Sequence, residues 1–263
     1  MTLDHDSKAL SQARFGRFAN GYVTSRTHAK GAELDRLVDI AQPQPDWLML
    51  DIATGGGHTA LKFAPHVEWV VASDISPAML DAARAFAAKK GAANVTYQLA
   101  DAEELPFEDG QFDLVTCRVA PHHFPDCPRF VHESARVLKV GGLLLVQDHV
   151  LPEDERTARY VDDFERLRDP SHNRAYSESE WVGMLNAEGL GLERREQVTK
   201  RHEFMLWVEL QRCTSHVVED LQGRLAQATD QVAEWMQPRD TGTATATFVN
   251  HHIIIAGRKE DCK

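Results

Sequence analysis

The sequence of 263 residues is poor in features that bind metals or cross-link a chain. Its four cysteines, Cys117, Cys127, Cys213 and Cys262, lie far apart and form no C-x-x-C pair. Cysteines spaced in this way indicate neither a disulfide framework nor a zinc site. We therefore expect reduced structural thiols, no bound metal and a cytoplasmic location.

Basic clusters and long apolar runs are also missing. The net charge is −11 and no run of Lys or Arg stands out, whereas proteins that bind the phosphate backbone gain affinity from clustered cations. No apolar run approaches the roughly 20 residues that span a bilayer, and the opening residues MTLDHDSKAL lack the apolar core of a signal peptide. These absences favour a small-molecule substrate and argue against nucleic-acid binding and membrane insertion. A homodimer stays open.

Strand-like and helix-like segments alternate from Trp47 onward, after a predicted amphipathic helix over 32–41. The patterns predict strands at 47–52, 67–76, 94–100, 111–120 and 141–150, with helices between them. Alternation at this spacing is typical of parallel βαβ units. The sequence therefore predicts an α/β fold with a doubly wound sheet.

Two longer segments interrupt the alternation, and both read as helical. They precede predicted strands at 190–198 and 244–258, and each is longer than a simple crossover needs. We expect one domain over 1–263. Its expected parts are an N-terminal helical segment (1–44), a cofactor-binding core (45–150) and a lid made by two helical insertions (151–177 and 200–243).

The central stretch is LMLDIATGGGHTA, residues 48–60, where a short apolar run ends in Asp51 and three glycines follow. Gly55, Gly57 and Ala60 formally fit the G-x-G-x-x-A pattern of dinucleotide sites. However, a carboxylate just before the glycines would lie close to the pyrophosphate of a dinucleotide. S-adenosylmethionine instead presents a sulfonium and an ammonium group, which a carboxylate attracts.

Two further carboxylates follow the next two predicted strands. Asp74 can accept hydrogen bonds from both ribose hydroxyls, but dinucleotide enzymes use the same chemistry, so it does not discriminate. Asp101 can accept a hydrogen bond from an adenine amino group, and the small Ala102 beside it lets the ring lie flat. The three carboxylates together favour S-adenosylmethionine over NAD.

The order of LDIATGGG, SDIS and DAEELPFEDGQFDLVTCRVAPHHF resembles the class I S-adenosylmethionine-dependent methyltransferases, in the branch related to ubiquinone and menaquinone biosynthesis. RLRDPSHNRAYSESEW is similar to a bacterial subgroup of the YcgJ type. The resemblance covers residues 45–150. It implies a three-layer Rossmann-like fold with a seven-stranded sheet of order 3-2-1-4-5-7-6, whose last strand is antiparallel. It also implies S-adenosylmethionine as methyl donor and S-adenosylhomocysteine as product.

The expected cofactor site combines the residue patterns with this resemblance. It comprises Tyr22, His28, Asp51, Ala53, Thr54, Gly55, Gly57, Thr59, Asp74, Ile75, Met79, Asp101, Ala102, Glu103 and Arg118. Ala53 departs from the glycine usual in the family. By the resemblance, Met79 packs on the adenine, Arg118 lies near the methionine part, and the N-terminal segment with Tyr22 and His28 folds over the cofactor.

The acceptor side is less defined. The sequence Val-Ala-Pro-His-His-Phe after the fourth strand lacks the paired prolines and aromatic residue of nitrogen- and DNA-methylating enzymes. His123 and His149 are candidate general bases, because the ordinary pKa of imidazole lies near neutrality; packed, hydrogen-bonded histidines are the alternative. The favoured function is a small-molecule methyltransferase, with an NAD-dependent oxidoreductase and a cofactor-binding protein without methyl transfer as alternatives.

Overall fold

The computed structural model describes residues 8–14 and 32–261, and its central feature is one sheet. The strands are β1 (Leu48–Ile52), β2 (Trp69–Asp74), β3 (Val95–Leu99), β4 (Phe112–Arg118), β5 (Leu138–Leu151), β6 (Tyr176–Ser177), β7 (Leu190–Glu203) and β8 (Thr247–Lys259). Their order is β3-β2-β1-β4-β5-β8-β7, with the two-residue β6 paired to β5 off this path. When β6 is set aside, this is the predicted order 3-2-1-4-5-7-6. β8 is antiparallel to both neighbours, which confirms the prediction for the last strand.

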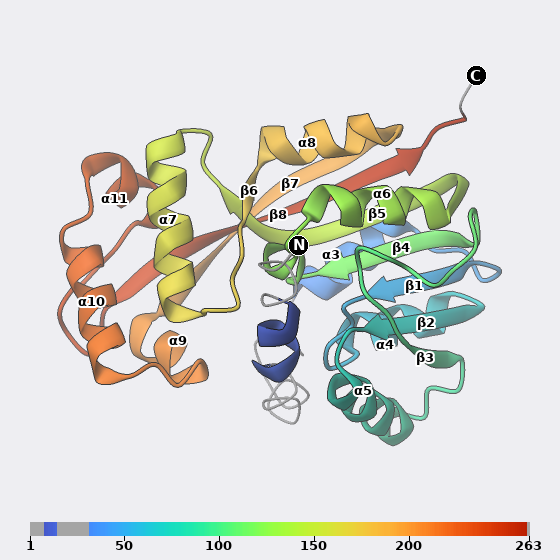
Figure 1. The fold of residues 1–263 in the computed structure, drawn as a ribbon, viewed down its shortest axis with the longest axis horizontal. Coiled ribbons are helices and arrows are strands. Elements are labelled where there is room, and N and C mark those ends of the chain that lie inside the picture. The colour runs from blue at the N-terminus through green and yellow to red at the C-terminus, as the bar shows by residue number, and fades with distance from the viewer. Residues whose placement is uncertain (1–7, 15–31, 262–263) are drawn as a thin grey trace.

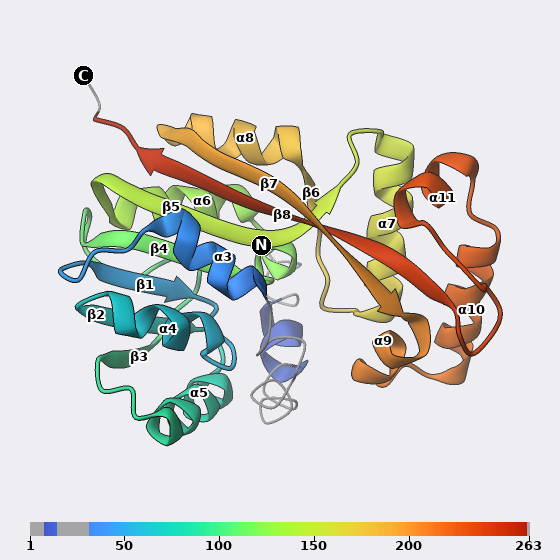
Figure 2. The same cartoon turned by 180° about the vertical axis from the view of Figure 1, so that it is seen from behind.

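Helices cover both faces of the sheet, as the doubly wound prediction requires (Figures 1 and 2). The α-helices of the core are α3 (Ala32–Ala41), α4 (His58–Phe63), α5 (Pro77–Lys90), α6 (Cys127–Val137) and α8 (Glu178–Ala187). Alternate strand residues pack in opposite directions, since successive side chains point to opposite faces. On β4, Val115 packs with α6 and α8, whereas Leu114 packs with α3 and α4.

Helix α5 begins and ends at residues that suit its two termini. Its N-cap Ser76 accepts a hydrogen bond from the backbone N–H of Met79, and Pro77 occupies the first turn, where its missing N–H costs nothing. Gly91 follows the last residue with a φ of 72°, the left-handed conformation that ends many helices. These caps fix where β2 ends and therefore where Asp74 is presented.

The two insertions lie together at one end of the molecule (Figure 1). The helices there, which we call the helical lobe, are α7 (Glu155–Arg168), α9 (Phe204–Leu210), α10 (Ser215–Ala226) and α11 (Asp230–Met236). They pack around a separate apolar core that includes Phe164, Trp207, Leu221, Met236 and Phe248. β5, β7 and β8 are longer than the other strands and run from the core into the lobe.

The boundaries of the second insertion differ from the prediction. β7 continues to Glu203 instead of ending at Val198, because it stays paired with β8 along the whole length of that strand. The helical pattern over 202–237 is confirmed from Phe204 onward, where it is divided into α9, α10 and α11. Thr214 interrupts it, because its side chain accepts a hydrogen bond from the backbone N–H of Val217 and so starts a new helix.

Candidate functional site: a pocket at the carboxyl ends of the strands

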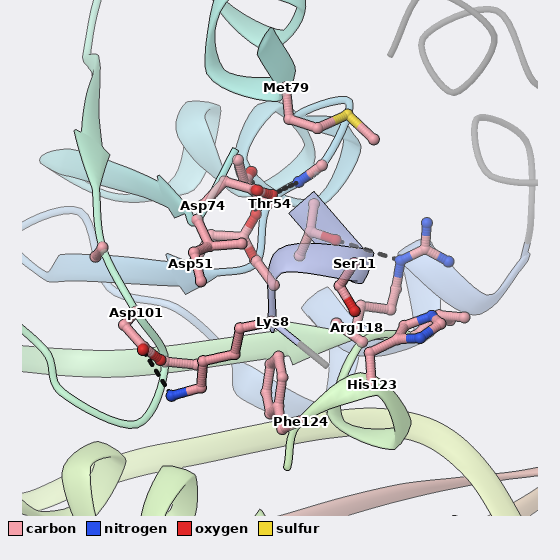
Figure 3. Close-up of a pocket in the computed structure, with 18 of the residues that line it drawn as sticks. Lys8, Ser11, Asp51, Thr54, Asp74, Met79, Asp101, Arg118, His123 and Phe124 are labelled. Carbon is pink, nitrogen blue, oxygen red and sulfur yellow. Dashed lines mark hydrogen bonds and ion pairs between the residues drawn. The ribbon is translucent and has the colours of Figure 1, made fainter. Parts of the chain in front are cut away.

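A pocket lies where β1, β2 and β4 end, the edge at which open α/β sheets bind ligands (Figure 3). The space within it is about 1060 Å³, part of it open to solvent. The lining residues are Lys8, Ser11, Asp51, Ala53, Thr54, Gly55, Gly56, His58, Thr59, Asp74, Ile75, Met79, Ala100, Asp101, Ala102, Glu103, Arg118, Val119, Ala120, His123, Phe124 and Pro125.

Asp51 stabilises the glycine turn through hydrogen bonds with residues on both sides of it. Its Oδ2 accepts hydrogen bonds from Thr54 Oγ1 (2.6 Å) and from the backbone N–H of Ala60 (3.2 Å), and its Oδ1 accepts one from Thr116 Oγ1 (2.7 Å). Burial raises the pKa of Asp51 to about 6, although these hydrogen bonds and Arg118 act in the opposite direction. The carboxylate is therefore largely ionised at neutral pH, and its charge lies under the floor of the pocket.

Asp74 lies on the same floor and joins the turn to the next strand. Its Oδ2 accepts a hydrogen bond from the backbone N–H of Gly55 and its Oδ1 accepts one from that of Ser76, both at 2.9 Å. Burial raises its pKa above the ordinary value. Gly55 has a φ of 53°, in the left-handed region where a side chain would strain the backbone.

Asp101 lies just after β3 and lines the pocket at the end of that strand. Its Oδ1 accepts a hydrogen bond from the backbone N–H of Glu103 (2.9 Å), and its Oδ2 forms an ion pair with Lys8 (2.7 Å). Lys8 also pairs with the Glu103 carboxylate. Lys8 belongs to a short helix, residues 8–14, that lies over this part of the pocket.

Positive charge lies across the pocket from the three carboxylates (Figure 3). Arg118 ends β4, and its Nε donates a hydrogen bond to Thr59 Oγ1 at 3.3 Å. Burial lowers the pKa of Arg118, while Glu33 and Asp51 raise it. The pocket therefore has an acidic floor and one guanidinium, an arrangement that suits a ligand with both cationic and anionic groups.

His123 and Phe124 form the wall nearest the helical lobe. His123 Nδ1 lies 2.9 Å from the backbone carbonyl oxygen of Ser171. A carbonyl only accepts, so this contact places the proton on Nδ1 and leaves Nε2 as the acceptor nitrogen of the neutral ring. Burial lowers the pKa of His123, which keeps the ring neutral at pH 7.

Two of the predicted residues lie away from this pocket. Gly57 has a φ of 79° and faces α5, where an added Cβ would lie 3.1 Å from Ala83 Cβ, so its part is close packing of the turn. His149 lies on β5 beyond Gln147, the residue that pairs with the end of β4. It lines a smaller cavity between β5, β8, α7 and α11 instead. The predicted Tyr22 and His28 fall outside the described residues.

The sequence analysis missed several lining residues. Phe124 follows the two histidines directly, so its position after the fourth strand was a usable signal. Lys8 and Ser11 carry no motif, and nothing in the sequence shows that residues 8–14 lie over the pocket. Ser11 Oγ is buried and has no hydrogen-bond partner among residues 8–14 and 32–261, so it is a polar atom that a ligand could contact.

Behind His123, histidines gather between the core and the helical lobe. We call His122, His123, His149, His172 and His252 the histidine cluster; His122 has its ring centroid 4.0 Å from that of His123, 4.6 Å from His149 and 5.2 Å from His172. His122 Nδ1 lies 2.6 Å from Asp148 Oδ1, and His172 Nε2 lies 2.7 Å from Asp162 Oδ1. Burial lowers the pKa of His122 and raises that of Asp148 to about 6, so a neutral imidazole donates to an ionised carboxylate near pH 7.

Comparison with known proteins agrees with this geometry. A methyltransferase domain family matches residues 50–146. The chain is 38% identical over 199 residues to an uncharacterised methyltransferase of Bacillus subtilis, YcgJ, covering 76% of this chain and 79% of the relative. The chain belongs to the class I S-adenosylmethionine-dependent methyltransferases. This methyltransferase is also 39% identical over 145 residues to a demethylmenaquinone methyltransferase of Thermus thermophilus, covering 52% and 65% of the two chains.

Solved structures extend the agreement to the insertions. The crystal structure of YcgJ superposes with a TM-score of 0.84 at 34% identity, covering 87% of this methyltransferase and 98% of YcgJ. A candidate methyltransferase of Bacillus halodurans gives a TM-score of 0.85 at 36% identity, covering 88% and 100%. The relatives and the strand order together favour the methyltransferase over the oxidoreductase alternative.

The described residues of this methyltransferase contain neither a metal-binding cluster nor a membrane-spanning helix. Within residues 8–14 and 32–261, no group of three or more His, Cys, Asp or Glu side chains is arranged to hold a metal ion. No helix in the same ranges is long and apolar enough to cross a bilayer. Cys117 and Cys127 are buried thiols and Cys213 is a partly buried one.

Proposed function

We propose that this methyltransferase transfers a methyl group in line from S-adenosylmethionine to a small organic acceptor, releasing S-adenosylhomocysteine. The observation that carries the proposal is the placing of Asp51, Asp74 and Asp101 at the ends of three neighbouring strands around one pocket. S-adenosylmethionine, when bound, supplies a methyl group on a sulfonium that is already a good leaving group. The protein's task is therefore mainly to orient the reactants and to exclude water.

The acidic side of the pocket fits the nucleoside half of the cofactor. Asp74 would accept the ribose hydroxyls, and Asp101 would accept from the adenine amino group beside Ala102. Met79 is buried and lines the same side, where its flexible thioether can pack on a flat ring. Ile75, Glu103 and Ser11 complete this side, with Lys8 balancing the charge of the two acids.

The opposite side fits the amino-acid half. Arg118 would attract the carboxylate of the cofactor, with Thr59 beside it. The floor made by Ala53, Thr54 and Gly55 lies over the ionised Asp51, whose charge attracts the ammonium and sulfonium groups. Asp51 would act through its field and by holding the turn, because three protein groups already donate to its two oxygens. Each oxygen of Asp74 accepts only one such hydrogen bond and keeps a lone pair for a ribose hydroxyl.

His123 is our candidate for the general base. It lines the pocket on the side of the helical lobe, and its neutral ring offers Nε2 as the proton acceptor. In the transfer, the acceptor atom forms a bond to the methyl carbon as the bond from carbon to sulfur breaks. The acceptor's proton passes to His123 Nε2 before or during this step.

The helical lobe would form one wall of the acceptor site and act as its lid. Its own apolar core and its place beside His123 support this role. A net charge of −11 supports a small-molecule acceptor rather than a nucleic acid. A cytoplasmic location and a homodimer belong to the same proposal, and analytical ultracentrifugation of the purified chain would test the homodimer.

Titration calorimetry tests the cofactor directly. We expect the chain to bind S-adenosylmethionine and S-adenosylhomocysteine in the micromolar range and NAD far more weakly. Binding of NAD with no heat from S-adenosylmethionine would contradict the proposal.

Activity is tested separately from binding. Phenols, quinones, amines and thiols would be offered with S-adenosylmethionine, and S-adenosylhomocysteine would be measured as the product. Turnover with one class would identify the methylated atom. No turnover with any class, despite tight cofactor binding, would favour a cofactor-binding protein without methyl transfer.

A further inference from the structure

The short helix of residues 8–14 is attached at one end to the cofactor side of the pocket. Lys8 forms ion pairs with Asp101 and Glu103 after β3. Gln12 donates through Nε2 to the backbone carbonyl oxygen of Ile75, at 3.0 Å, after β2. This end of the helix therefore touches both strand ends that would hold the nucleoside half of the cofactor.

The other end of the same helix is attached to the helical lobe. Arg14 Nε lies 3.0 Å from Asp169 Oδ1, in the loop after α7, and its Nη2 donates to Gln211 Oε1 at 2.7 Å, just after α9. Gln211 Nε2 in turn donates to Asp169 Oδ2 at 2.8 Å. Three segments far apart in the sequence thus meet in a closed triangle of polar contacts.

Asp169 connects this triangle to His123 through one turn of backbone. Its Oδ1 accepts hydrogen bonds from the backbone N–H and the hydroxyl of Ser171, and the carbonyl oxygen of Ser171 faces His123 Nδ1 at 2.9 Å. Asp169 and Ser171 are buried, at 5% and 2% exposure. Ser171 and Gln211 donate three hydrogen bonds to the Asp169 carboxylate, and Arg14 Nε contacts it as an ion pair without a hydrogen bond. Connected buried polar groups hold one another in place, so Asp169 sets the direction of the Ser171 carbonyl.

We propose that Arg14 and Asp169 are positioning residues for His123, and that helix 8–14 couples occupancy of the cofactor pocket to the orientation of that base. The inference rests on the proposed function, in which His123 takes the acceptor's proton. Arg14 touches neither the cofactor side of the pocket nor His123. It acts by holding Asp169, which fixes Ser171 and thereby the tautomer of the imidazole.

Cofactor binding and the orientation of His123 are coupled because helix 8–14 contacts both the cofactor pocket and Asp169. A ligand that fills the pocket beneath Lys8 and Ser11 adds contacts to helix 8–14 and stabilises its docked position. The docked helix keeps Arg14 on Asp169. A site that is filled with cofactor would therefore have a more fully ordered base than an empty one, which is positive coupling between two parts of one site.

The test uses the full chain and needs no acceptor. Nitrogen-15 NMR of the histidine rings reports the tautomer and the pKa of His123, whose signals are assigned by their loss in His123→Gln. For the wild type we expect the Nδ1–H tautomer and a pKa below the ordinary value. In Arg14→Gln we expect a mixture of tautomers and a pKa shifted upward toward 6.5, because the ring gains solvent and Asp169 loses its balancing cation.

Two further variants separate positioning from general loss of structure. Arg14→Lys keeps the charge and should restore most of the wild-type tautomer. Arg36→Gln removes an ion pair between α3 and β7 with Glu196, remote from the pocket, and should leave the His123 signals unchanged. Identical tautomer and titration in Arg14→Gln and the wild type would overturn the proposal.

Calorimetry with S-adenosylhomocysteine tests the coupling. We expect Arg14→Gln to bind it about three- to tenfold more weakly than the wild type and Arg36→Gln to bind it equally well. Equal affinity in Arg14→Gln would overturn the coupling. Failure of the wild type itself to bind S-adenosylhomocysteine would contradict the proposed function, while the tautomer comparison would still decide whether Arg14 positions His123.

Discussion

The pocket carboxylates and the histidine cluster are both buried and titratable, yet they are stabilised in different ways. Asp51 and Asp74 keep a charge because backbone N–H groups and hydroxyls donate to their oxygens. His122 and His149 are instead held neutral by burial, which lowers their pKa values well below the ordinary one. The carboxylates around the pocket are held in their charged form, whereas burial holds the rings of His122 and His149 in their neutral form.

The difference shows what each region can do for methyl transfer. A dually charged cofactor needs fixed charges around it, and the ends of parallel strands supply them from rigid positions. A general base needs an unprotonated nitrogen in a dry environment, which the histidine cluster supplies at His123. The two regions meet at the wall of the pocket, where the acceptor would have to lie.

The largest effect on stability is expected from removing Asp148, the carboxylate that is hydrogen-bonded to His122 in the histidine cluster. Asp148 accepts hydrogen bonds from the ring and the backbone N–H of His122, at 2.6 and 2.7 Å. Asp148→Ala would leave two buried donors unsatisfied and lower the free energy of unfolding by about 4 kcal/mol. Urea denaturation would measure the loss. Asp148→Asn keeps an acceptor oxygen and should lose less than half as much; equal losses would show that the contacts do not matter.

The second-largest effect is expected from acidification, which should destabilise the histidine cluster. A histidine with a lowered folded pKa contributes stability that is present above its unfolded value of about 6.5 and is lost as the pH falls below it. His122, His123, His149 and His252 all have lowered values. Asp51 and Asp148, both raised to about 6, act in the opposite direction, because they gain stability as they protonate.

Burial also raises the pKa values of Asp74 and Glu165 and lowers those of His202 and His251. Six histidines therefore oppose four acids, and we expect a net loss of unfolding free energy on the order of 3 kcal/mol between pH 7 and pH 5. Thermal or urea unfolding at a series of pH values would measure it. A variant with His149→Phe should show a shallower slope. Stability that rises over this range would mean that the acids dominate.

Asp74→Ala should nearly abolish cofactor binding. It also removes the acceptor of the backbone N–H groups of Gly55 and Ser76, so we expect a lower free energy of unfolding in a chain that still folds. Loss of two charge-assisted hydrogen bonds to the ribose corresponds to at least about 100-fold in affinity. Calorimetry with S-adenosylhomocysteine measures this, with circular dichroism as the check on folding. Asp81→Ala, an exposed carboxylate on α5 paired with Arg84, is the matched control and should bind normally. Near-normal affinity in Asp74→Ala would refute the ribose assignment.

The smallest effect is expected on cofactor affinity, when Asp51 becomes protonated as the pH falls. Because its pKa is raised to about 6, the negative charge under the pocket is lost as the pH falls through this value. We expect the affinity for S-adenosylmethionine to fall about tenfold between pH 7.5 and pH 5, within the range in which the chain stays folded. S-adenosylhomocysteine, which lacks the sulfonium charge, should lose less. An equal decrease for both ligands would assign the effect to another group.

The sequence predicts the positions of the pocket carboxylates far better than those of the histidine cluster. Asp51, Asp74 and Asp101 each follow a recognisable strand, and parallel strands bring their carboxyl ends to one edge, so their meeting required no tertiary information. His149 also stands near the end of a strand. However, β5 continues past the end of β4 and carries His149 toward the lobe, and only the lengths of neighbouring strands reveal this.

The contacts between distant segments lay beyond sequence reasoning for a related reason. Arg14, Asp169 and Gln211 belong to three segments with no periodic or motif signal in common. Their meeting depends on how the helical lobe packs against the sheet. The pattern over 202–237 likewise indicated helix without showing the break at Thr214, because a single capping hydroxyl decides it.

The long strand β8 has a consequence for how the chain folds. It pairs with β5 and β7 along its length, and its residues contribute both to the core, through Ile254, and to the lobe, through Phe248. Residues 152–246 lie between β5 and β8 along the chain, so bringing these two strands together has a large entropic cost before any pairing is gained. Neither part has a finished sheet until that strand docks. We therefore expect core and lobe to reach the native state in one late cooperative step, and not as two modules that fold in turn.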